Sequence, residues 1–238
     1  MKIALIGYGK MGHEVQQILL NRGHEIVFIT DDFVKDSDHS DFLTADVAIE
    51  FTVPEAAISN IHRAAEKGIP IVCGTTGWLS NIDEVSDFIN QKDATLFYAS
   101  NYSVGMYLFR QLNIKLAQLM QPYSQYSPSM QEVHHIHKKD APSGTAITLA
   151  EELIQQNPAL SGWSLIPIES KEILPIEAIR EGQVVGKHSI TYSSDFDTIE
   201  IVHDAHNRKG FALGAVLAAE FIADKKGVFT MNNLFNLK

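Results

Sequence analysis

The densest group of chemically active side chains in this sequence lies in one continuous segment, Glu132 to Ala146. It carries three histidines and two lysines, and it passes through a Pro-Ser-Gly-Thr run into a helical pattern at Ile147 to Gln156. Imidazoles exchange protons near neutral pH, and a nearby amine supplies positive charge or, when desolvated, an acid. The helix start and the hydroxyls of Ser143 and Thr145 offer hydrogen-bond donors. The segment therefore predicts an anion pocket equipped to deliver a proton.

Other interpretations of these histidines remain open. Zinc is the rival ligand for His134, His135 and His137. Alternating side chains would put His135 and His137 on one face of a strand, but no cysteine or second histidine group is spaced as a partner, so we predict no metal. Any of the three could instead be satisfied inside the fold as a structural residue. A nucleophilic Ser143 is disfavoured because its surroundings do not form a G-x-S-x-G turn.

A second motif is the G-x-G-x-x-G pattern at Gly7, Gly9 and Gly12, which follows an apolar run and precedes a helical pattern. In dinucleotide-binding turns the first glycine permits the tight turn, the second lets the backbone approach a pyrophosphate, and the third allows close helix–strand packing. Asp31 comes nineteen residues after Gly12, where a carboxylate can accept hydrogen bonds from ribose hydroxyls. The motif predicts a nicotinamide dinucleotide site rather than a glycine turn without a ligand.

The acidic residues after the second expected strand bear on the choice of dinucleotide. Asp32 adjoins Asp31, and no arginine occurs between residues 30 and 41. A 2′-phosphate placed there would meet two carboxylates, which favours NADH over NADPH. Lys10 and Lys35 are the nearby cations that could reverse this preference. The remaining acidic side chains of the stretch are expected to form a solvated loop.

The run Gly74-Thr75-Thr76-Gly77 follows another expected strand, Ile69 to Cys73. This places it at the carboxyl edge of the sheet, where open α/β folds bind ligands, and its backbone could touch the nicotinamide end. An ordinary strand-to-helix turn is the alternative. Cys73 is interpreted as a small buried hydrophobic residue and not a nucleophile, because apolar neighbours raise the pKa of a thiol.

The elements that must position these motifs can be outlined from hydrophobic periodicity. Apolar strand candidates in the first hundred residues are Lys2 to Ile6, Glu25 to Ile29, Val47 to Phe51, Ile69 to Cys73 and Thr95 to Tyr98. Helical patterns between them include Glu55 to Glu66 and Ile82 to Asn90. Strands alternating with helices predict an α/β, Rossmann-type parallel sheet covered on both faces.

The pattern changes after about Ser103. Helices are expected at Met106 to Met120, Ile147 to Gln156 and Ala212 to Ala223, and strands at Ser129 to His135, Ser189 to Tyr192 and Asp197 to His203. These predict a smaller α+β domain with a mixed sheet. We find no internal repeat at the spacing of solenoid or propeller proteins.

Composition sets outer limits on function. The 238 residues are 45% hydrophobic and 20% charged, which excludes a disordered, collagen-like or coiled-coil protein and indicates one large domain or two modest ones. The net charge of 19 − 29 = −10 has the wrong sign for binding nucleic acid or anionic lipid through the overall field. One cysteine and an apolar N-terminal run of only four residues favour a cytoplasmic protein that is neither exported nor embedded in a membrane.

The motifs together resemble those of the dihydrodipicolinate reductase family, which performs the reducing step of the diaminopimelate route to lysine. The resemblance runs nearly end to end and is most specific in the segment from His134 to Ala146, because a run of that length rarely arises by chance. The runs that carry it are Gly7 to Gly12, Phe51 to Glu55, Gly74 to Gly77, Asn101 to Gly105 and His134 to Ala146.

The resemblance implies a role for each motif. It implies that His134 is the acid/base residue and Lys138 the proton donor. Residues implied to hold the carboxylates of a small cyclic dicarboxylate are His135, Lys138, Ser143, Gly144 and Thr145. Residues expected to bind NADH or NADPH are Gly7, Tyr8, Gly9, Lys10, Met11, Gly12, Asp31, Gly74, Thr75, Thr76, Ala99, Ser100, Asn101 and Tyr102. Two residues depart from the family pattern, since Ile136 and Asp32 stand where many members carry arginine.

The resemblance also implies a domain plan and an assembly. Residues 1–104, completed by 213–238, would bind the nucleotide, and residues 105–212 would bind substrate and join four copies into a homotetramer. Segments Asn101 to Gly105 and Phe211 to Gly214 would act as hinges. The alternatives are another two-domain NAD(P)-dependent dehydrogenase acting on an amino or keto dicarboxylate, such as an aspartate dehydrogenase, and a nucleotide-sensing protein without turnover.

Overall fold

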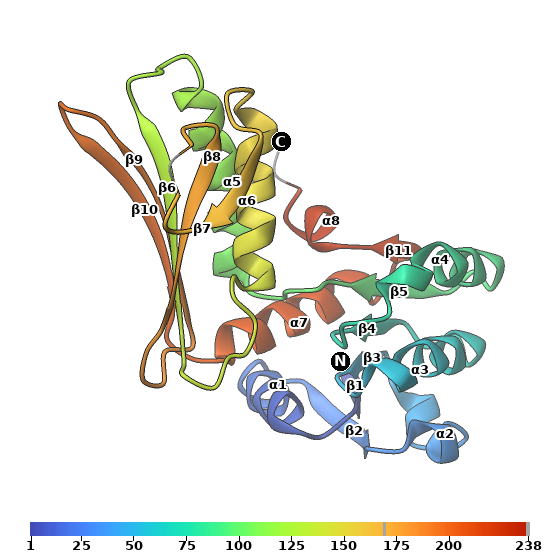
Figure 1. Cartoon of the computed structure of the whole chain (residues 1–238). Helices are drawn as coiled ribbons and strands as arrows, with labels where there is room; N and C mark the ends of the chain where they lie inside the picture. Colours follow the sequence, from blue (N-terminus) through green and yellow to red (C-terminus); the bar gives the residue numbers. More distant parts are fainter. Residues whose placement is uncertain (169, 237–238) are drawn as a thin grey trace. The chain divides into compact units, whose positions relative to one another are not determined.

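A computed structural model describes residues 1–168 and 170–236 and divides the chain into two compact units (Figure 1). Unit 1 comprises Met1–Val104 together with the chain from Arg208 onward, and unit 2 comprises Gly105–Asn207. The expected second boundary, after residue 212, falls inside helix α7 (Lys209–Ile222). The expected hinge segment, Phe211 to Gly214, lies within the same helix, and its role as a hinge stays a prediction.

Unit 1 is built on a six-stranded parallel sheet in the order β11-β5-β4-β3-β1-β2. Its strands are β1 (Lys2–Ile6), β2 (Glu25–Thr30), β3 (Val47–Glu50), β4 (Ile71–Cys73), β5 (Thr95–Tyr98) and β11 (Gly227–Phe229). Its longer helices are α1 (Lys10–Asn21), α3 (Pro54–Glu66), α4 (Ile82–Gln91) and α7. Short helical turns lie at α2 (Phe33–Asp36), η1 (Phe42–Thr44), η2 (Leu79–Asn81) and α8 (Met231–Phe235).

The sheet of unit 1 is buried on both faces, as the continuous apolar strands predict. In β1, Ala4 and Ile6 pack into a cluster with α3 and α4, while the alternating Ile3 and Leu5 are equally inaccessible to solvent. Helix α1 packs against α7 and α3 against α4. This is the predicted Rossmann-type arrangement, completed by a last strand that sequence patterning did not identify.

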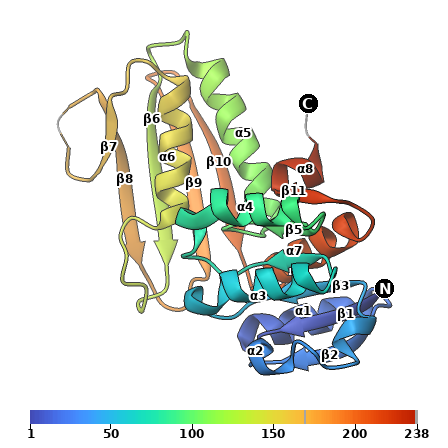
Figure 2. The same ribbon diagram turned by 90° about the vertical axis from the view of Figure 1, so that its right-hand side faces the viewer.

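Unit 2 is a five-stranded mixed sheet in the order β10-β9-β6-β8-β7. Its strands are β6 (Ser127–His134), β7 (Gly162–Leu165), β8 (Ile173–Arg180), β9 (Gly186–Ser193) and β10 (Thr198–Ala205). Strand β6 runs antiparallel to β9 and parallel to β8. Helices α5 (Val104–Met120) and α6 (Gly144–Gln156) cover one face of the sheet, as Figures 1 and 2 show.

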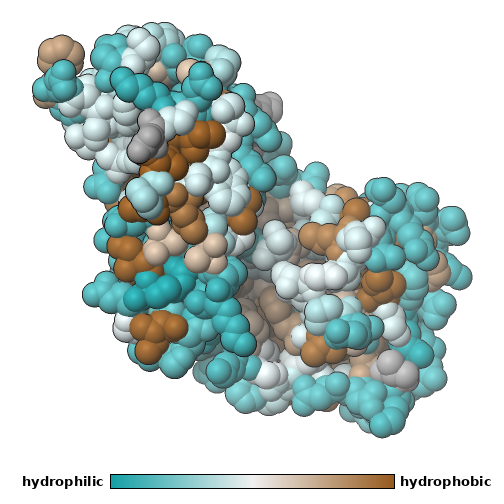
Figure 3. All heavy atoms as spheres, viewed as in Figure 1, coloured by the Kyte–Doolittle hydropathy of each residue, from teal (hydrophilic) through white to brown (hydrophobic). Residues whose placement is uncertain are grey.

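The covered face of this sheet forms the core of unit 2. Met130, Ile176 and Ile190 lie on neighbouring strands at matched register and pack with Leu149 and Leu153 of α6. Figure 3 shows hydrophobic side chains gathered in patches on the otherwise hydrophilic surface. Throughout residues 1–168 and 170–236, every helix is too short or too polar to span a bilayer.

Candidate functional site

The glycine-rich turn between β1 and α1 has a different physical requirement at each glycine. Gly7 has φ +90°, and a Cβ atom added there would lie 2.0 Å from the carbonyl oxygen of Phe51. A Cβ at Gly12 would lie 2.5 Å from the Gly7 oxygen, as expected for close helix–strand packing. A Cβ at Gly9 would meet no atom within 4 Å. Internal packing thus explains Gly7 and Gly12, whereas Gly9 presents bare backbone to open space.

A pocket of about 250 Å³ adjoins this turn. Its lining residues are Gly7, Tyr8, Gly9, Asp31, Asp32, Phe33, Phe51, Thr52, Val53, Ala56 and Asn60. Gly9 is the N-cap residue of α1 and supplies no side-chain cap, so amides of the first turn keep free donor capacity. Lys10, Met11 and Gly12 form that first turn. The pocket combines anion-binding amides with an acidic rim, which suits a nucleotide that carries both phosphate and ribose.

The acidic rim is ordered by local contacts. Asp31 Oδ1 accepts a 2.6 Å hydrogen bond from the backbone amide of Tyr8, which fixes the carboxylate beside the glycine turn. Asp32 Oδ2 lies 2.7 Å from Lys35 Nζ. A hydrogen bond from Lys35 lowers the pKa of Asp32, so this carboxylate stays ionised. Of the two lysines named above, Lys35 therefore already has an anionic partner.

A buried carboxylate that the sequence analysis missed, Glu50, organises the carboxyl ends of β3 and β4. It is fully buried and accepts hydrogen bonds from Thr75 Oγ1 at 2.9 Å, Thr52 N at 3.0 Å and Cys73 Sγ at 3.0 Å. Thr75 is thus occupied with internal bonding, while Thr76 is exposed. Burial, with the nearby Glu50 charge, raises the pKa of Cys73 well above its usual range, which agrees with an unreactive thiol.

The segment after β5 has both buried and accessible residues. Ser100 is exposed, Ala99 and Asn101 are partly buried, and the Asn101 side chain accepts a hydrogen bond from the backbone of Ser103. Tyr102 is 3% exposed, and its hydroxyl donates to the Cys73 carbonyl at 2.7 Å. The Tyr102 side chain is therefore packed inside unit 1, and the place of Tyr102 in a cofactor site stays a prediction.

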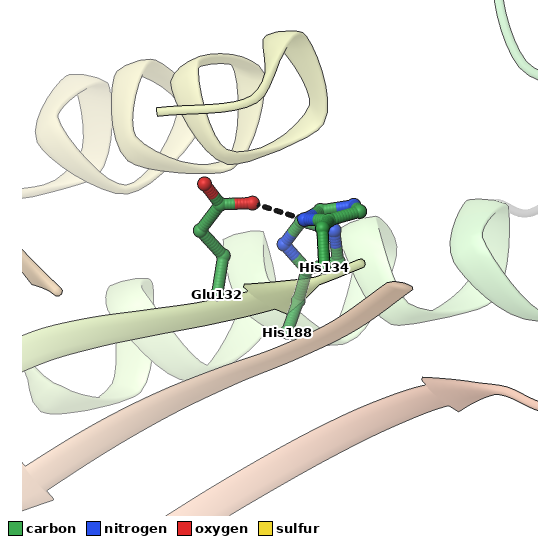
Figure 4. Close-up of side chains that lie close together, drawn as sticks. All are labelled: Glu132, His134 and His188. Carbon is green, nitrogen blue, oxygen red and sulfur yellow. Dashed lines mark ion pairs between the residues drawn. The ribbon is translucent and has the colours of Figure 1, made fainter. Parts of the chain in front are cut away.

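The register of the sheet in unit 2 assembles the second part of the site. Glu132 and His134 alternate onto the same face of β6 (Figure 4). His188 of β9 pairs directly with Glu132, and Arg180 of β8 pairs with His134. Directly paired residues share a face, so four polar side chains converge where the apolar core of the sheet ends. His134 was predicted, and Glu132 opens the same segment of sequence but was given no role. Arg180 and His188 carry no local sequence signal that singles them out.

Glu132 is the electrostatic centre of this group. It is fully buried, its Oε2 forms an ion-pair contact with His134 Nδ1, and its Oε1 accepts a 2.8 Å hydrogen bond from Arg180 Nη2. Burial acts to raise the pKa of Glu132, but hydrogen bonds from His134, Arg180 and the Ser143 amide outweigh it and lower the pKa to about 2. Burial and the neighbouring His134 lower the pKa of His188 to about 4, so His188 is neutral at pH 7.

The loop after β6 carries the other predicted residues. Lys138 Nζ lies 2.8 Å from Asp140 Oδ1, and His135 is partly buried. Ser143 is 2% exposed and caps α6, its Oγ accepting from Ala146 N at 3.2 Å. Gly144 is exposed and Thr145 is partly buried in the first turn of α6. Ser143 thus has a structural role that the anion-pocket hypothesis did not include.

The zinc alternative is not supported in the form considered. Strand β6 ends at His134, so His137 is not on a strand face, and the His135 and His137 rings are 6.2 Å apart. Glu132, His134 and His188 do place ligand-type atoms within 4.8 Å of one another. However, the positive Arg180 guanidinium binds the same carboxylate, and Glu132 contacts His134 directly, which disfavours a divalent cation between them.

Comparisons with known proteins place these motifs in context. Residues 1–102 match the family model described as dihydrodipicolinate reductase, N-terminus, and residues 105–235 match its C-terminus. The chain is 48% identical over 236 residues to 4-hydroxy-tetrahydrodipicolinate reductase of Christiangramia forsetii, covering 99% of this chain and 98% of the relative. It is 33% identical over 251 residues to the enzyme of the same name from Staphylococcus carnosus, covering 99% and 100%.

Solved structures show the same fold. A dipicolinate-bound dihydrodipicolinate reductase from Paenisporosarcina sp. TG-14 matches with a TM-score of 0.76 at 21% identity, covering 98% of each chain. An amine dehydrogenase from Mycobacterium smegmatis matches with a TM-score of 0.59 at 10% identity, covering 96% of this chain and 94% of that one.

Proposed function

Because the chain belongs to the dihydrodipicolinate reductase family of oxidoreductases, we propose that it reduces 4-hydroxy-tetrahydrodipicolinate to tetrahydrodipicolinate, in the diaminopimelate route to lysine. The observation that carries this proposal is the pairing of two separately built features in one chain. One is a glycine turn with an adjoining acidic pocket, and the other is a histidine on a buried carboxylate beside a lysine loop and a helix start.

The reaction adds one hydride and one proton to the substrate and releases water and the oxidised nucleotide. A bound nicotinamide supplies the hydride. Loss of the 4-hydroxyl group and a proton from the adjacent ring carbon, as water, gives a ring C=C bond conjugated with the imine. Hydride addition to the far end of that conjugated system then leaves an enamine, which must gain a proton. Lys138 is proposed as the donor of that proton and His134 as the acid/base residue.

Anion recognition is proposed for the residues around the start of α6. His135, Lys138, Ser143, Gly144 and Thr145 would hold the two carboxylates of the cyclic substrate. Amides of the first helical turn and the Lys138 charge favour anions in a chain whose net charge is −10. Among these residues Gly144 is exposed, His135, Lys138 and Thr145 are partly buried, and Ser143 is buried.

NADH is the proposed preferred cofactor, held by the residues of the glycine turn, Asp31 and the segments that follow β4 and β5. The argument is electrostatic, because Asp31 and Asp32 are both exposed on the pocket rim and Lys35 is already paired with Asp32. A 2′-phosphate would have to compete for that lysine. A specificity constant for NADPH equal to or above that for NADH would overturn the preference.

We also propose self-association through the sheet of unit 2 into a homotetramer. Phe196 is 82% exposed and Val202 48% exposed at the β9–β10 hairpin, which is unusual for large apolar side chains unless another surface covers them. Light scattering on the full chain and on a Phe196→Asp variant tests this. A wild-type mass equal to one chain would contradict it.

The decisive experiment follows the loss of reduced-nicotinamide absorbance when protein, NADH and freshly generated substrate are mixed. Substrate-dependent oxidation is expected. A parallel reaction with a keto dicarboxylate and ammonia tests for a different dehydrogenase. NADH binding without turnover on either substrate would indicate a sensor and would refute the proposed activity.

A further inference from the structure

We propose that Glu132, held by Arg180, is a positioning residue that orients His134 and couples it to both the Lys138 loop and the start of α6. The inference rests on the proposed function, because it assigns a role within the same reaction. Glu132 itself touches no reacting atom and acts through the groups that it holds. Sequence reasoning gave it no role, and the register of three strands brings it to the site.

The first step of the argument concerns the His134 ring. Its Nδ1 and Glu132 Oε2 are in ion-pair contact inside the protein, where two facing lone pairs would repel, so a proton must lie between them. A carboxylate on Nδ1–H fixes the tautomer and stabilises the imidazolium when it forms. Nε2 is then the nitrogen that exchanges a proton with a ligand. A Cβ at Gly186 would lie only 3.0 Å from Nε2, so the absence of a side chain there keeps that nitrogen uncrowded.

The second step concerns Arg180. Its Nη2 donates to Glu132 Oε1 at 2.8 Å and also to the backbone carbonyl of Asp140 at 2.5 Å. Asp140 is the residue that pairs with Lys138. One guanidinium therefore joins the buried carboxylate to the loop that carries the proposed proton donor.

The third step concerns the helix start. Glu132 Oε1 also accepts the backbone amide of Ser143 at 3.1 Å, and Ser143 is the N-cap of α6. Three contacts with the Glu132 carboxylate, made by His134, Arg180 and Ser143, thus set the relative positions of the acid/base residue, the lysine loop and the anion-binding turn. An isolated buried ion pair that only stabilised the fold would not need to touch all three.

The test compares wild type with Glu132→Gln, which keeps the side-chain shape and removes the charge. We expect kcat to fall roughly 10²-fold, while the KM for NADH stays within about twofold, because the nucleotide contacts lie in unit 1. The shape of the kcat/KM pH profile should also change, because the variant removes the buried negative charge that contacts His134. The titratable and charged groups around His134 are Glu132, which contacts it, His188, whose ring centroid lies 5.3 Å from that of His134, and Arg180, which binds the same Glu132 carboxylate. The same pH profile is therefore recorded for His188→Asn to measure the contribution of His188.

Glu177→Gln is the matched control. Glu177 lies on β8 next to the same strand, where it accepts a hydrogen bond from Gln131 on the other side of the sheet, and its loss should leave kcat and the pH profile unchanged. Glu132→Asp provides a second variant if Glu132→Gln does not fold, because it keeps the charge but withdraws it from His134. It should give an intermediate kcat.

A readout independent of turnover separates this inference from the proposed function. Nitrogen NMR of labelled protein should show His134 as the Nδ1–H tautomer in wild type and a mixture in Glu132→Gln. This result stands even if the substrate is misassigned. Folded Glu132→Gln with wild-type kcat, pH profile and tautomer would overturn the inference. Loss of wild-type activity on treatment with a chelator, restored by a divalent metal, would overturn it as well by showing that the cluster binds a cation.

Discussion

Replacing Gly9 by alanine separates ligand binding from folding more cleanly than any other change in the glycine turn. Gly9 has φ −79°, which alanine adopts readily, and its Cβ would meet no protein atom within 4 Å. The free energy of unfolding should therefore change by no more than about 1 kcal/mol, and in the stabilising direction, because alanine restricts the unfolded chain. The new methyl group would occupy the space through which a pyrophosphate approaches the backbone.

Gly7→Ala should behave in the opposite way. At φ +90° a non-glycine residue costs roughly 1–3 kcal/mol, and a Cβ 2.0 Å from the Phe51 oxygen forces a backbone shift in addition. The free energy of unfolding of Gly7→Ala should therefore be clearly lower than that of wild type. The two variants, two positions apart in the sequence, thus have contrasting expected stabilities that come only from the geometry of the turn.

The assay combines thermal unfolding with titration of NADH fluorescence. For Gly9→Ala we expect a melting temperature at or slightly above that of wild type and a Kd at least tenfold higher, which corresponds to about 1.4 kcal/mol of lost binding. Gly210→Ala is the control, because a Cβ at Gly210 also meets nothing within 4 Å but lies in α7. Gly9→Ala with wild-type NADH affinity would refute the placement of the cofactor at this turn.

Three further predictions test the chemistry of the two units. Lys138→Ala should lower kcat by about 10²- to 10⁴-fold with little change in NADH binding, whereas Lys139→Ala should leave kcat unchanged. Equal kinetics for the two variants would exclude Lys138 as the proton donor. The folded-state pKa of Glu132 is lowered to about 2 from 4.5, so its stabilising contribution is complete above about pH 4.5 and is lost as the pH falls towards 2. In urea titrations, the difference in unfolding free energy between wild type and Glu132→Gln should therefore narrow between pH 4.5 and 2. A difference that stays constant over this range would contradict the prediction. Because burial raises the pKa of the Cys73 thiol, a thiol reagent at mildly alkaline pH should label the native protein far more slowly than the unfolded protein, and equal rates would show that the thiol is accessible.

Sequence patterning predicted the first five strands of unit 1 well because each of them is a local apolar run. The first strand was placed with its observed bounds, Lys2–Ile6, since the apolar run ends at an obligatory glycine. Strand β8 was missed because Pro175 interrupts its apolar pattern, and β11 because three residues carry too little periodicity. Those two strands are defined by their pairing with β6 and β5, which a linear pattern does not contain.

The residues of the candidate site likewise divide into those that a local sequence pattern predicted and those that only strand pairing brings together. His134 and Lys138 stand in one conspicuous run and were predicted. Glu132 opens the same run but was given no role, and it meets Arg180 and His188 only through register across three strands. Arg180 and His188 are ordinary residues in their own stretches of sequence. The alternation argument for His135 and His137 failed because the strand ends at His134 and the chain turns there.

The order of the elements along the chain has a consequence for synthesis on the ribosome. Residues 1–104 emerge first but lack β11, which pairs with β5, and α7, whose Gly214 approaches the Tyr102 backbone so closely that no side chain fits. The residues of unit 2 follow as one uninterrupted stretch and can finish folding before the nascent nucleotide unit receives its last strand. During that interval the β5 edge is an open template for unwanted strand pairing, and it closes only when β11 has left the ribosome and paired with β5.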